Sequence, residues 1–420
     1  MKSLYLFRRD LRFSDNRGLM EALSKSDVVA PIFIIDEAKP ESSKFRLIIE
    51  ILRSLGDRVN VFYGNTIDIL EELSHKFDAI YTSHPWSWSE DELIARIEKF
   101  CQSKGLKFFK VVDNVLANPL TIKPSYNFKS FYSIWKRNLD LNMVVNFPLE
   151  KLIRLDGPSL KELIKRHGWI IENRWCEWLS KRIKSFNFKR YAELKDYPYL
   201  DGTSRLSPFI NLGVISIRYL YSIAKESEEF IRQMAWREYY YHLRIRYPFM
   251  KNLELKANMR NIKWENKKEY ILAFKEAKTG YPIIDAGVRQ LKQENWIHNR
   301  IRLIMANFFV KDLNIDWRIG EEFFKEYLID YDEVLNVGNW QWCASVGVDP
   351  LPMRIFNPII QASKYDPQCL YIKKYIPELE GYECHQLHDP LKYKIKGYYE
   401  PIVNHYEQVA KYRAKYRKAF

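Results

Sequence analysis

The chain has 420 residues, enough for two or more domains, and its 67 Lys and Arg against 53 Asp and Glu give a net charge of +14. A surplus of this size is typical of proteins that bind nucleic acid, although a lysine-rich, well-solvated surface produces the same number. Five scattered cysteines argue against a disulfide framework or a zinc site, and the lack of a signal peptide or a long apolar run predicts a cytoplasmic protein with no membrane contact.

Strand-like and helix-like segments alternate through residues 1–113. The strand-like segments are residues 3–7, 28–35, 58–63, 79–82 and 107–112, and helical patterns lie between them at 16–23, 44–55, 66–73 and 90–104. This alternation predicts an α/β domain with a doubly wound parallel sheet. No G-x-G-x-x-G follows the first strand, so ordinary dinucleotide binding is not expected there.

Basic and aromatic residues follow two of these strands. The segment F-R-R-D-L-R places Arg8, Arg9 and Arg12 after the first strand, and Trp86 and Trp88 follow the fourth. The carboxyl ends of parallel strands meet at one edge, where open sheets bind ligands, so these residues could hold a second aromatic ligand. Arg–Asp ion pairs and loop packing explain the same residues equally well.

The rest of the chain changes character twice. Residues 114–157 lack a clear period and contain three prolines, so we expect an irregular connector over the surface. Residues 158–420 should form an all-helical domain. Its predicted helices are 158–166, 173–186, 216–222, 228–246, 267–278, 285–294, 298–311, 316–329 and 402–418.

The stretch 330–342 reads D-Y-D-E-V-L-N-V-G-N-W-Q-W and mixes carboxylates, an amide and indoles. Asp330, Asp332 and Asn336 could bond sugar hydroxyls or ring N–H groups. Trp340 and Trp342 could stack on a flat ligand or carry electrons. The alternative is that the acids cap a helix and the tryptophans fill the core.

Three further stretches suit the same kind of ligand. Residues 202–207 read G-T-S-R-L-S, whose hydroxyls, arginine and backbone N–H groups fit a pyrophosphate, although such runs also cap helices. Gln233, Trp236 and Arg237 share one helix face and resemble a binding wall. Arg302, in W-I-H-N-R-I-R, could pair with a carboxylate of the 330–342 stretch. His298 has no partner at metal-ligand spacing, so we expect no metal.

Several long motifs follow one another in the chain: T-S-R-L-S, W-R-E, K-T-G-Y-P-I-I-D-A, W-I-H-N-R-I-R, V-K-D-L-x-I-D-W-R-x-G and G-N-W-Q-W-C-A-S. With these motifs in this order, the chain resembles the DNA photolyase/cryptochrome family. Within that family it is most similar to the class I-like photolyases that repair cyclobutane pyrimidine dimers. The resemblance runs from F-R-R-D-L-R to Y-Y-E-P-I-V-N-H and is densest between residues 191 and 362. It implies an N-terminal α/β domain, a connector over 114–157 and a helical FAD- and DNA-binding domain over 158–420.

The resemblance implies a bound FAD and assigns side chains to it. The 203–207 run would hold the diphosphate, Arg302 and Asp330 would pair beside the ring, and Asn336 would face the central-ring nitrogen of the flavin. An amide at this last position is typical of photolyases, whereas an acid or a thiol is typical of many signalling cryptochromes. The full cofactor-binding set is Tyr191, Thr203, Ser204, Arg205, Leu206, Ser207, Phe230, Arg237, Asn299, Arg302, Asp330, Asp332 and Asn336.

Two further sets follow from the resemblance. Trp340, Trp317 and Trp264 match the three-tryptophan electron path of the family, with Trp340 as the first donor. Gln233 and Leu303 depart from the pattern of dimer-repair enzymes, which usually have Glu at the first position and often Met at the second. The DNA-binding set is Gln233, Trp236, Asn299, Arg300, Leu303 and Trp342, whose two indoles would wall a flipped dimer.

The implied function is light-dependent DNA repair, in which excited reduced FAD passes an electron to a cyclobutane pyrimidine dimer and the dimer splits. The partner would be UV-damaged DNA, bound by a monomer. The alternatives are a cryptochrome-like blue-light photoreceptor, a (6-4) photolyase, which Gln233 suits, and a flavoprotein oxidoreductase without repair activity. For the antenna chromophore we favour a second flavin, FMN or FAD, over deazaflavin or folate.

Overall fold

The computed structural model describes residues 1–36, 42–123, 125–171, 174–349 and 354–417, and the helix ends predicted at residues 173 and 418 lie outside these ranges. The chain forms two compact units. Unit 1 comprises Met1–Lys123, Lys129–Phe188 and Ser204–Tyr241, and unit 2 comprises Pro124–Phe128, Lys189–Thr203 and His242–Phe420. The domain boundaries after residues 113 and 157 were placed where the spacing of apolar residues changes along the sequence, and they stay a prediction.

Unit 1 contains a parallel five-stranded sheet in the order β3-β2-β1-β4-β5. The chain winds outward from β1 to β3 and then returns to β4 on the other side of β1, which confirms the predicted doubly wound sheet. The strands are β1 (Lys2–Leu6), β2 (Val28–Ile35), β3 (Asn60–Tyr63), β4 (Ala79–Ser83) and β5 (Lys107–Val111).

Helices provide the long crossovers that parallel strands require. Leu4, Ile32 and Ile80 of the sheet pack in one buried cluster with Leu70 of α3 and Ile97 of α4, so these two helices cover the same face. The predicted helices match the observed ones within two residues at each end. They are α1 (Arg17–Lys25), α2 (Ser43–Leu55), α3 (Thr66–Ser74) and α4 (Trp88–Lys104).

The stretch predicted as an irregular connector contains a helix, α5 (Phe128–Arg137), so the prediction was wrong there. Phe131 and Trp135, one turn apart, are buried, and Nε1 of Trp135 donates to the Glu238 carboxylate at 2.7 Å. Glu238 also accepts from two backbone N–H groups of the connector. The three prolines flank this helix and do not interrupt it, so the apolar spacing was the usable signal.

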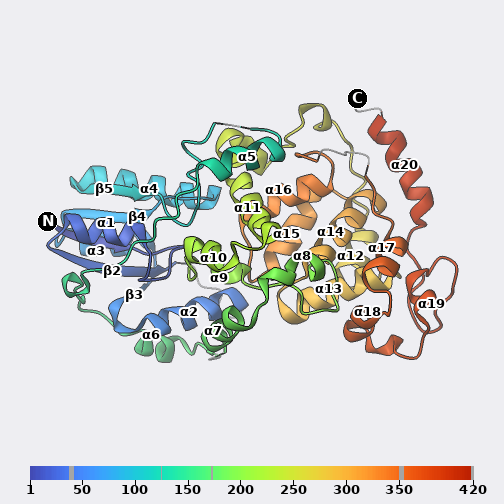
Figure 1. The fold of residues 1–420 in the computed structure, drawn as a ribbon, viewed down its shortest axis with the longest axis horizontal. Helices are drawn as coiled ribbons and strands as arrows, with labels where there is room; N and C mark the ends of the chain where they lie inside the picture. Colours follow the sequence, from blue (N-terminus) through green and yellow to red (C-terminus); the bar gives the residue numbers. More distant parts are fainter. Residues whose placement is uncertain (37–41, 124, 172–173, 350–353, 418–420) are drawn as a thin grey trace. The chain divides into compact units, whose positions relative to one another are not determined.

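The remaining helices confirm the predicted helix-rich C-terminal region (Figure 1). Unit 1 contains α6 (Leu160–His167), α7 (Trp175–Ser185), α9 (Ser207–Asn211), α10 (Ile217–Ala224) and the part of α11 (Glu228–Arg246) that ends at Tyr241. Unit 2 contains α8 (Tyr191–Leu194), α12 (Lys268–Lys275), α13 (Pro282–Glu294), α14 (Asn299–Asn307), α15 (Trp317–Tyr327), α16 (Glu333–Cys343), α17 (Pro358–Tyr365), α18 (Leu370–Tyr375), α19 (Cys384–His388) and α20 (His405–Arg417).

Short helical turns complete the described chain. The 3₁₀ turns are Gly56–Arg58, Leu149–Lys151, Phe188–Arg190, Pro248–Lys251, Ala257–Met259 and Pro377–Leu379. The helix predicted at 298–311 is instead α14 followed by a π-helix, η6 (Phe308–Asp312). Within the described ranges, every helix is too short or too polar to cross a membrane.

Candidate functional site

The stretch 330–342 begins with an ion pair and a helix cap in unit 2. The Asp330 carboxylate accepts from Nη2 of Arg302 at 2.8 and 3.1 Å, which is the ion pair that the sequence predicted. Arg302 is fixed in turn, because its Nε donates to the carbonyl oxygen of Ile297 at 2.9 Å. Asp332 accepts from two backbone N–H groups and caps α16, in agreement with the helix-cap interpretation.

Asn336 is held by a buried carboxylate that sequence reasoning missed. Its amide nitrogen donates to Oε1 of Glu321 at 3.0 Å and to the Glu321 carbonyl oxygen at 3.1 Å. The Tyr331 hydroxyl donates to the same Oε1, and burial raises the pKa of Glu321. Both Asn336 bonds use the NH₂ group, so the side-chain oxygen is not committed to them and could accept from a ring N–H.

Three tryptophans of unit 2 are arranged around the start of α15. Trp317 is its first residue, and Trp340 packs against Gly320, one turn further along. The backbone N–H that follows Trp264 donates to the carbonyl oxygen of Asn314, just before α15. Trp317 and Trp340 are buried and Trp264 is half-buried, so the series leads from the core towards solvent, which suits stepwise electron transfer.

Trp317, the middle tryptophan of the series, contacts two charged side chains, Glu254 and Arg318. Its Nε1 donates to Oε1 of Glu254 at 3.2 Å, and Nη2 of Arg318 lies 2.8 Å from the same oxygen. The Arg318 guanidinium also lies 4.6 Å from the centre of the Trp317 ring. Glu254 therefore offsets the arginine and stabilises positive charge on the indole. Nothing in the sequence spacing marks Glu254, because its partners lie more than sixty residues away.

In unit 1, α11 carries Gln233, Trp236 and Arg237 on one face, as their spacing predicted. Nη1 of Arg237 donates to the carbonyl oxygen of Asn114 at 2.8 Å, while Nη2 is buried without a hydrogen-bond partner among the described residues. An unsatisfied buried guanidinium nitrogen costs free energy, so this position fits a phosphate or a carbonyl oxygen such as FAD provides. Nε2 of Gln233 donates to Glu229 at 3.0 Å, and Trp236 is half-buried.

The predicted diphosphate-binding run ends at Ser207, the first residue of α9. Arg205 has a φ of 54°, and Nε of Arg182 donates to the Ser204 carbonyl oxygen at 3.1 Å, which brings a second guanidinium to the run. Leu206 is fully buried, so its side chain belongs to the core, and a contact to the cofactor would have to come from its backbone.

The other predicted contacts differ in exposure. In unit 1, Phe230 is buried, with its ring 4.9 Å from that of Phe188. In unit 2, Nη2 of Arg300 donates to Asp196 at 2.7 Å and its guanidinium stacks on Tyr365, so its charge is already paired. Asn299 is exposed, whereas the half-buried positions of unit 2 are Tyr191, Thr203, Leu303 and Trp342.

Known proteins resemble both ends of the chain. Residues 3–151 match the model of DNA photolyase, and residues 230–418 match that of the FAD binding domain of DNA photolyase. The deoxyribodipyrimidine photo-lyase of Alkalihalophilus pseudofirmus is 32% identical over 96% of this chain and 95% of its own. The chain belongs to the DNA photolyase family. The photo-lyase of Halobacterium salinarum is a further family member, 30% identical over 96% of both chains.

Solved photolyase structures have the same fold. The archaeal photolyase from Sulfolobus tokodaii, whose crystal structure contains two FAD molecules, is 33% identical and superposes with a TM-score of 0.88 over 100% of both chains. The class III photolyase from Agrobacterium tumefaciens is 26% identical, with a TM-score of 0.86 over 100% of this chain and 97% of its own. The photolyase fold therefore extends over both units.

In this photolyase-family chain, the arginines after β1 make internal contacts. Arg8 donates to the Ser83 carbonyl oxygen at 2.7 Å, and Arg9 donates to that of the last residue of α9 at 3.0 Å. Trp86 and Trp88 are only 3% and 7% exposed. Of the two interpretations of these residues, loop packing therefore fits the indoles better than docking of a flat ligand.

The third arginine after β1, Arg12, belongs to a buried cluster of two arginines and two aspartates in unit 1. Nη2 of Arg12 lies 2.5 Å from Asp113, and Arg218 bonds Asp113 at 2.7 Å and Asp15 at 2.8 Å. Burial would raise the pKa of Asp113, but the guanidinium groups of Arg12 and Arg218 outweigh it and lower that pKa. Removing one partner from such a cluster typically costs about 3–5 kcal/mol, because a buried charge is left uncompensated.

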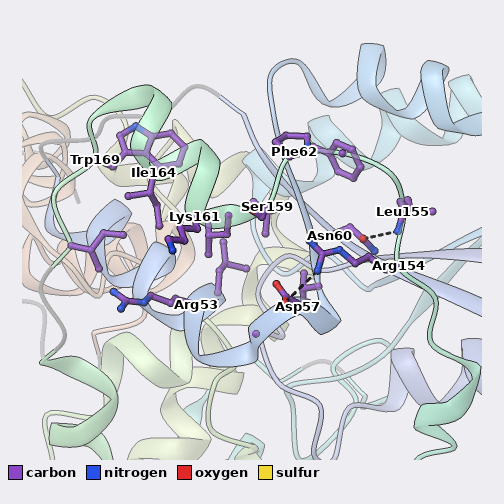
Figure 2. A pocket seen from close by; sticks show the side chains of 18 residues that line it. Arg53, Asp57, Asn60, Phe62, Arg154, Leu155, Ser159, Lys161, Ile164 and Trp169 are labelled. Carbon is purple, nitrogen blue, oxygen red and sulfur yellow. Dashed lines mark hydrogen bonds and ion pairs between the residues drawn. The ribbon is translucent and has the colours of Figure 1, made fainter.

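A cavity of about 590 Å³ in unit 1 lies apart from these candidates (Figure 2). It is lined by α2, β3 and α6, with Phe62 and Trp169 among its apolar walls and Arg154 paired to Asp57 at 3.3 Å near one end. No predicted cofactor or DNA contact is among its lining residues. The candidate site of this photolyase-family chain is therefore defined by side-chain chemistry and not by this cavity.

Gly320→Ala tests whether the Trp340 packing matters. The added Cβ would overlap the six-membered ring of Trp340, so we expect a loss of about 1–3 kcal/mol in the free energy of unfolding and slower photoreduction. Thermal unfolding and the rate of photoreduction per bound FAD measure the two effects. Gly381→Ala is the matched control, because a Cβ there has open space. Equal behaviour of the two variants would contradict the packing argument.

Proposed function

We propose that this protein repairs cyclobutane pyrimidine dimers in UV-damaged DNA by a light-dependent reaction with FAD as cofactor. The observation that carries the proposal is the 330–342 stretch, which combines the Arg302–Asp330 ion pair, the oriented Asn336 amide and the buried Trp340. This stretch lies in a chain that matches deoxyribodipyrimidine photo-lyases over nearly its full length. Bound FAD would supply the light-driven electron transfer that splits the dimer.

The side chains have separate tasks towards the cofactor. Arg237 would donate its unsatisfied Nη2 to a FAD oxygen, and Asn336 would accept from the ring through an oxygen oriented by Glu321. Arg302 would place a guanidinium beside the ring, and Asp330 would cancel most of its charge.

The electron path would restore the reduced cofactor when it becomes oxidised. Trp340 would donate first, Trp317 would refill it, and Trp264 would connect the path to solvent. Glu254 would favour the middle step, since its carboxylate contacts the indole N–H that becomes more acidic when Trp317 is oxidised.

DNA binding would depend on charge and stacking. The surplus of 14 positive charges predicts contacts to phosphates and a steep loss of affinity with salt. Trp236 and Trp342 would stack on the flipped bases, and Gln233 would hydrogen-bond an exposed base edge. We also propose that the protein acts as a cytoplasmic monomer and carries a second flavin as antenna, as the two FAD molecules of the Sulfolobus tokodaii photolyase suggest.

The direct test is repair of dimer-containing DNA by the purified protein under blue light and in the dark. We expect dimers to disappear only in the light, without strand cleavage. Failure on cyclobutane dimers together with repair of (6-4) products would transfer the proposal to the alternative lesion. Binding of FAD without repair of either lesion would favour a photoreceptor.

Gln233→Glu should preserve or improve cyclobutane-dimer repair at slightly acidic pH and lower it as pH rises. The new carboxyl group would lie against Glu229, which now accepts from Gln233 at 3.0 Å, and two carboxylates at this distance share a proton. The protonated form can donate to a thymine carbonyl oxygen, whereas the ionised form cannot. Repair yield from pH 5 to 8, compared with wild type, measures this effect.

A second change separates the lesion contact from the pair of acids. Adding Glu229→Gln to Gln233→Glu removes the repulsion, so the pH at which repair declines should fall. If neither variant alters the pH profile, Gln233 does not contact the lesion.

A further inference from the structure

Two cysteines of unit 2, far apart in sequence relative to a helical turn, are neighbours in the fold. Cys369 directly precedes α18 and Cys384 begins α19. The Cys369 sulfur lies 3.8 Å from the carbonyl oxygen of Cys384, so the two residues are neighbours in the fold. Cys369 is fully buried and Cys384 is half-buried, so an external reagent reaches Cys384 first.

The backbone at Cys369 has an unfavourable conformation for this residue type. Its φ is 53°, in the left-handed region that glycine adopts without steric cost. A non-glycine residue held there costs roughly 1–3 kcal/mol, and such positions are often functional. The thiol is therefore kept at a position where glycine would be the less strained choice.

A histidine completes the group. Nε2 of His388 lies 3.1 Å from the Cys369 sulfur and 2.9 Å from the Asp366 carbonyl oxygen. A carbonyl oxygen only accepts, so the bond to Asp366 assigns a hydrogen to Nε2, and this N–H group also faces the sulfur. A donor beside the sulfur favours the thiolate form of Cys369. It acts against burial and the neighbouring Cys384, which both raise the pKa of Cys369.

We propose that Cys369 and Cys384 are a dithiol oxidation site that closes to a disulfide by exchange with a low-molecular-weight disulfide. The Cys384 thiolate attacks one sulfur of that oxidant, and the first small thiol leaves. Cys369 then attacks the Cys384 sulfur of the mixed disulfide, and its proton passes to the second departing thiolate. Two protein thiols are oxidised, and one small disulfide is reduced to two thiols.

The disulfide would close a loop that contains α18. This helix is already held on α13, since the Tyr371 hydroxyl donates to Gln290 at 2.8 Å and that of Tyr375 donates to Glu294 at 2.5 Å. Closing a loop of about 15 residues restricts the unfolded chain and should raise the melting temperature by roughly 3–7 °C.

The test uses the full-length, FAD-loaded protein, equilibrated with either oxidised glutathione or dithiothreitol, then denatured and alkylated with N-ethylmaleimide. We expect label on all five cysteines after reduction. After oxidation, a peptide cross-linked through Cys369 and Cys384 should appear and the melting temperature should rise. Labelling of both cysteines at excess oxidised glutathione would overturn the proposal, as would bound zinc that blocks their oxidation.

Matched variants separate the disulfide from a packing effect. Cys369→Gly removes the thiol and relieves the backbone, so under reducing conditions it should be at least as stable as wild type and should lose the rise on oxidation. Cys384→Ser should also lose the rise, whereas Cys101→Ser, in unit 1, should keep it. A rise that persists in Cys369→Gly would disprove this pairing.

Discussion

Trp340→Phe should nearly abolish photoreduction of the oxidised protein and leave dimer repair intact when FAD is reduced chemically beforehand. Phenylalanine is far harder to oxidise than tryptophan, so the first electron donor would be missing. The ring should still pack, because Phe309 and Phe324 contact Trp340 edge-on at 5.7 and 4.9 Å and retain an aromatic partner. Absorbance during illumination and single-turnover repair with pre-reduced protein measure the two activities separately.

A buried tryptophan outside the proposed path provides the control. Trp169 lies in unit 1 and is 7% exposed, so Trp169→Phe loses a similar buried indole without touching the electron donors. It should photoreduce like wild type. Loss of both photoreduction and repair in Trp340→Phe, together with loss of FAD, would show that Trp340 is needed for cofactor binding and not for electron transfer alone.

Lys311→Met should stabilise the protein by up to about 3 kcal/mol at pH 7. Lys311 is 1% exposed within the π-helix, and burial lowers its pKa from 10.5 to about 8. Each pKa unit corresponds to about 1.4 kcal/mol, so a charged lysine at this position opposes folding. Loss of its hydrogen bond to the Arg354 carbonyl oxygen would offset part of the gain.

The stabilisation expected for Lys311→Met should depend on pH in a defined direction. Between pH 8 and 10.5 the unfolded chain binds more protons than the folded chain, so wild-type stability rises with pH across this window. The advantage of the methionine variant should therefore shrink above pH 8. Denaturant unfolding from pH 6 to 10 measures it, with the exposed Lys325→Met as control. An advantage that stays constant with pH would show that packing, and not charge, is responsible.

Much of the fold follows from local patterns in the sequence. The five strands and the helices between them were predicted within two residues, because apolar runs of strand length alternate with helical spacing. The Arg302–Asp330 ion pair and the shared face of Gln233, Trp236 and Arg237 were also predicted. The π-helix was not, because its ladder of hydrogen bonds leaves no mark in the spacing of apolar residues.

What the sequence did not predict depends on distant partners. Trp86 and Trp88 look like ligand-binding indoles in the sequence, yet both are buried, and the ring of Trp86 is stacked on that of Tyr241, far along the chain. Glu321 and Glu254 orient Asn336 and Trp317, and neither carries a motif of its own. A single sequence shows which side chains have the chemistry to bind a ligand. Tertiary packing decides which of them already have partners within the protein.

The buried cluster around Asp113 also constrains the order in which the chain can fold during synthesis. All five strands have been made once residue 111 has left the ribosome, but Asp15 and Asp113 still lack the Arg218 guanidinium. Until the ribosome has passed α10, the nascent sheet domain must keep these carboxylates in water or bury them with incomplete neutralisation. The N-terminal sheet can therefore reach its final packing only after more than half of the protein has been translated.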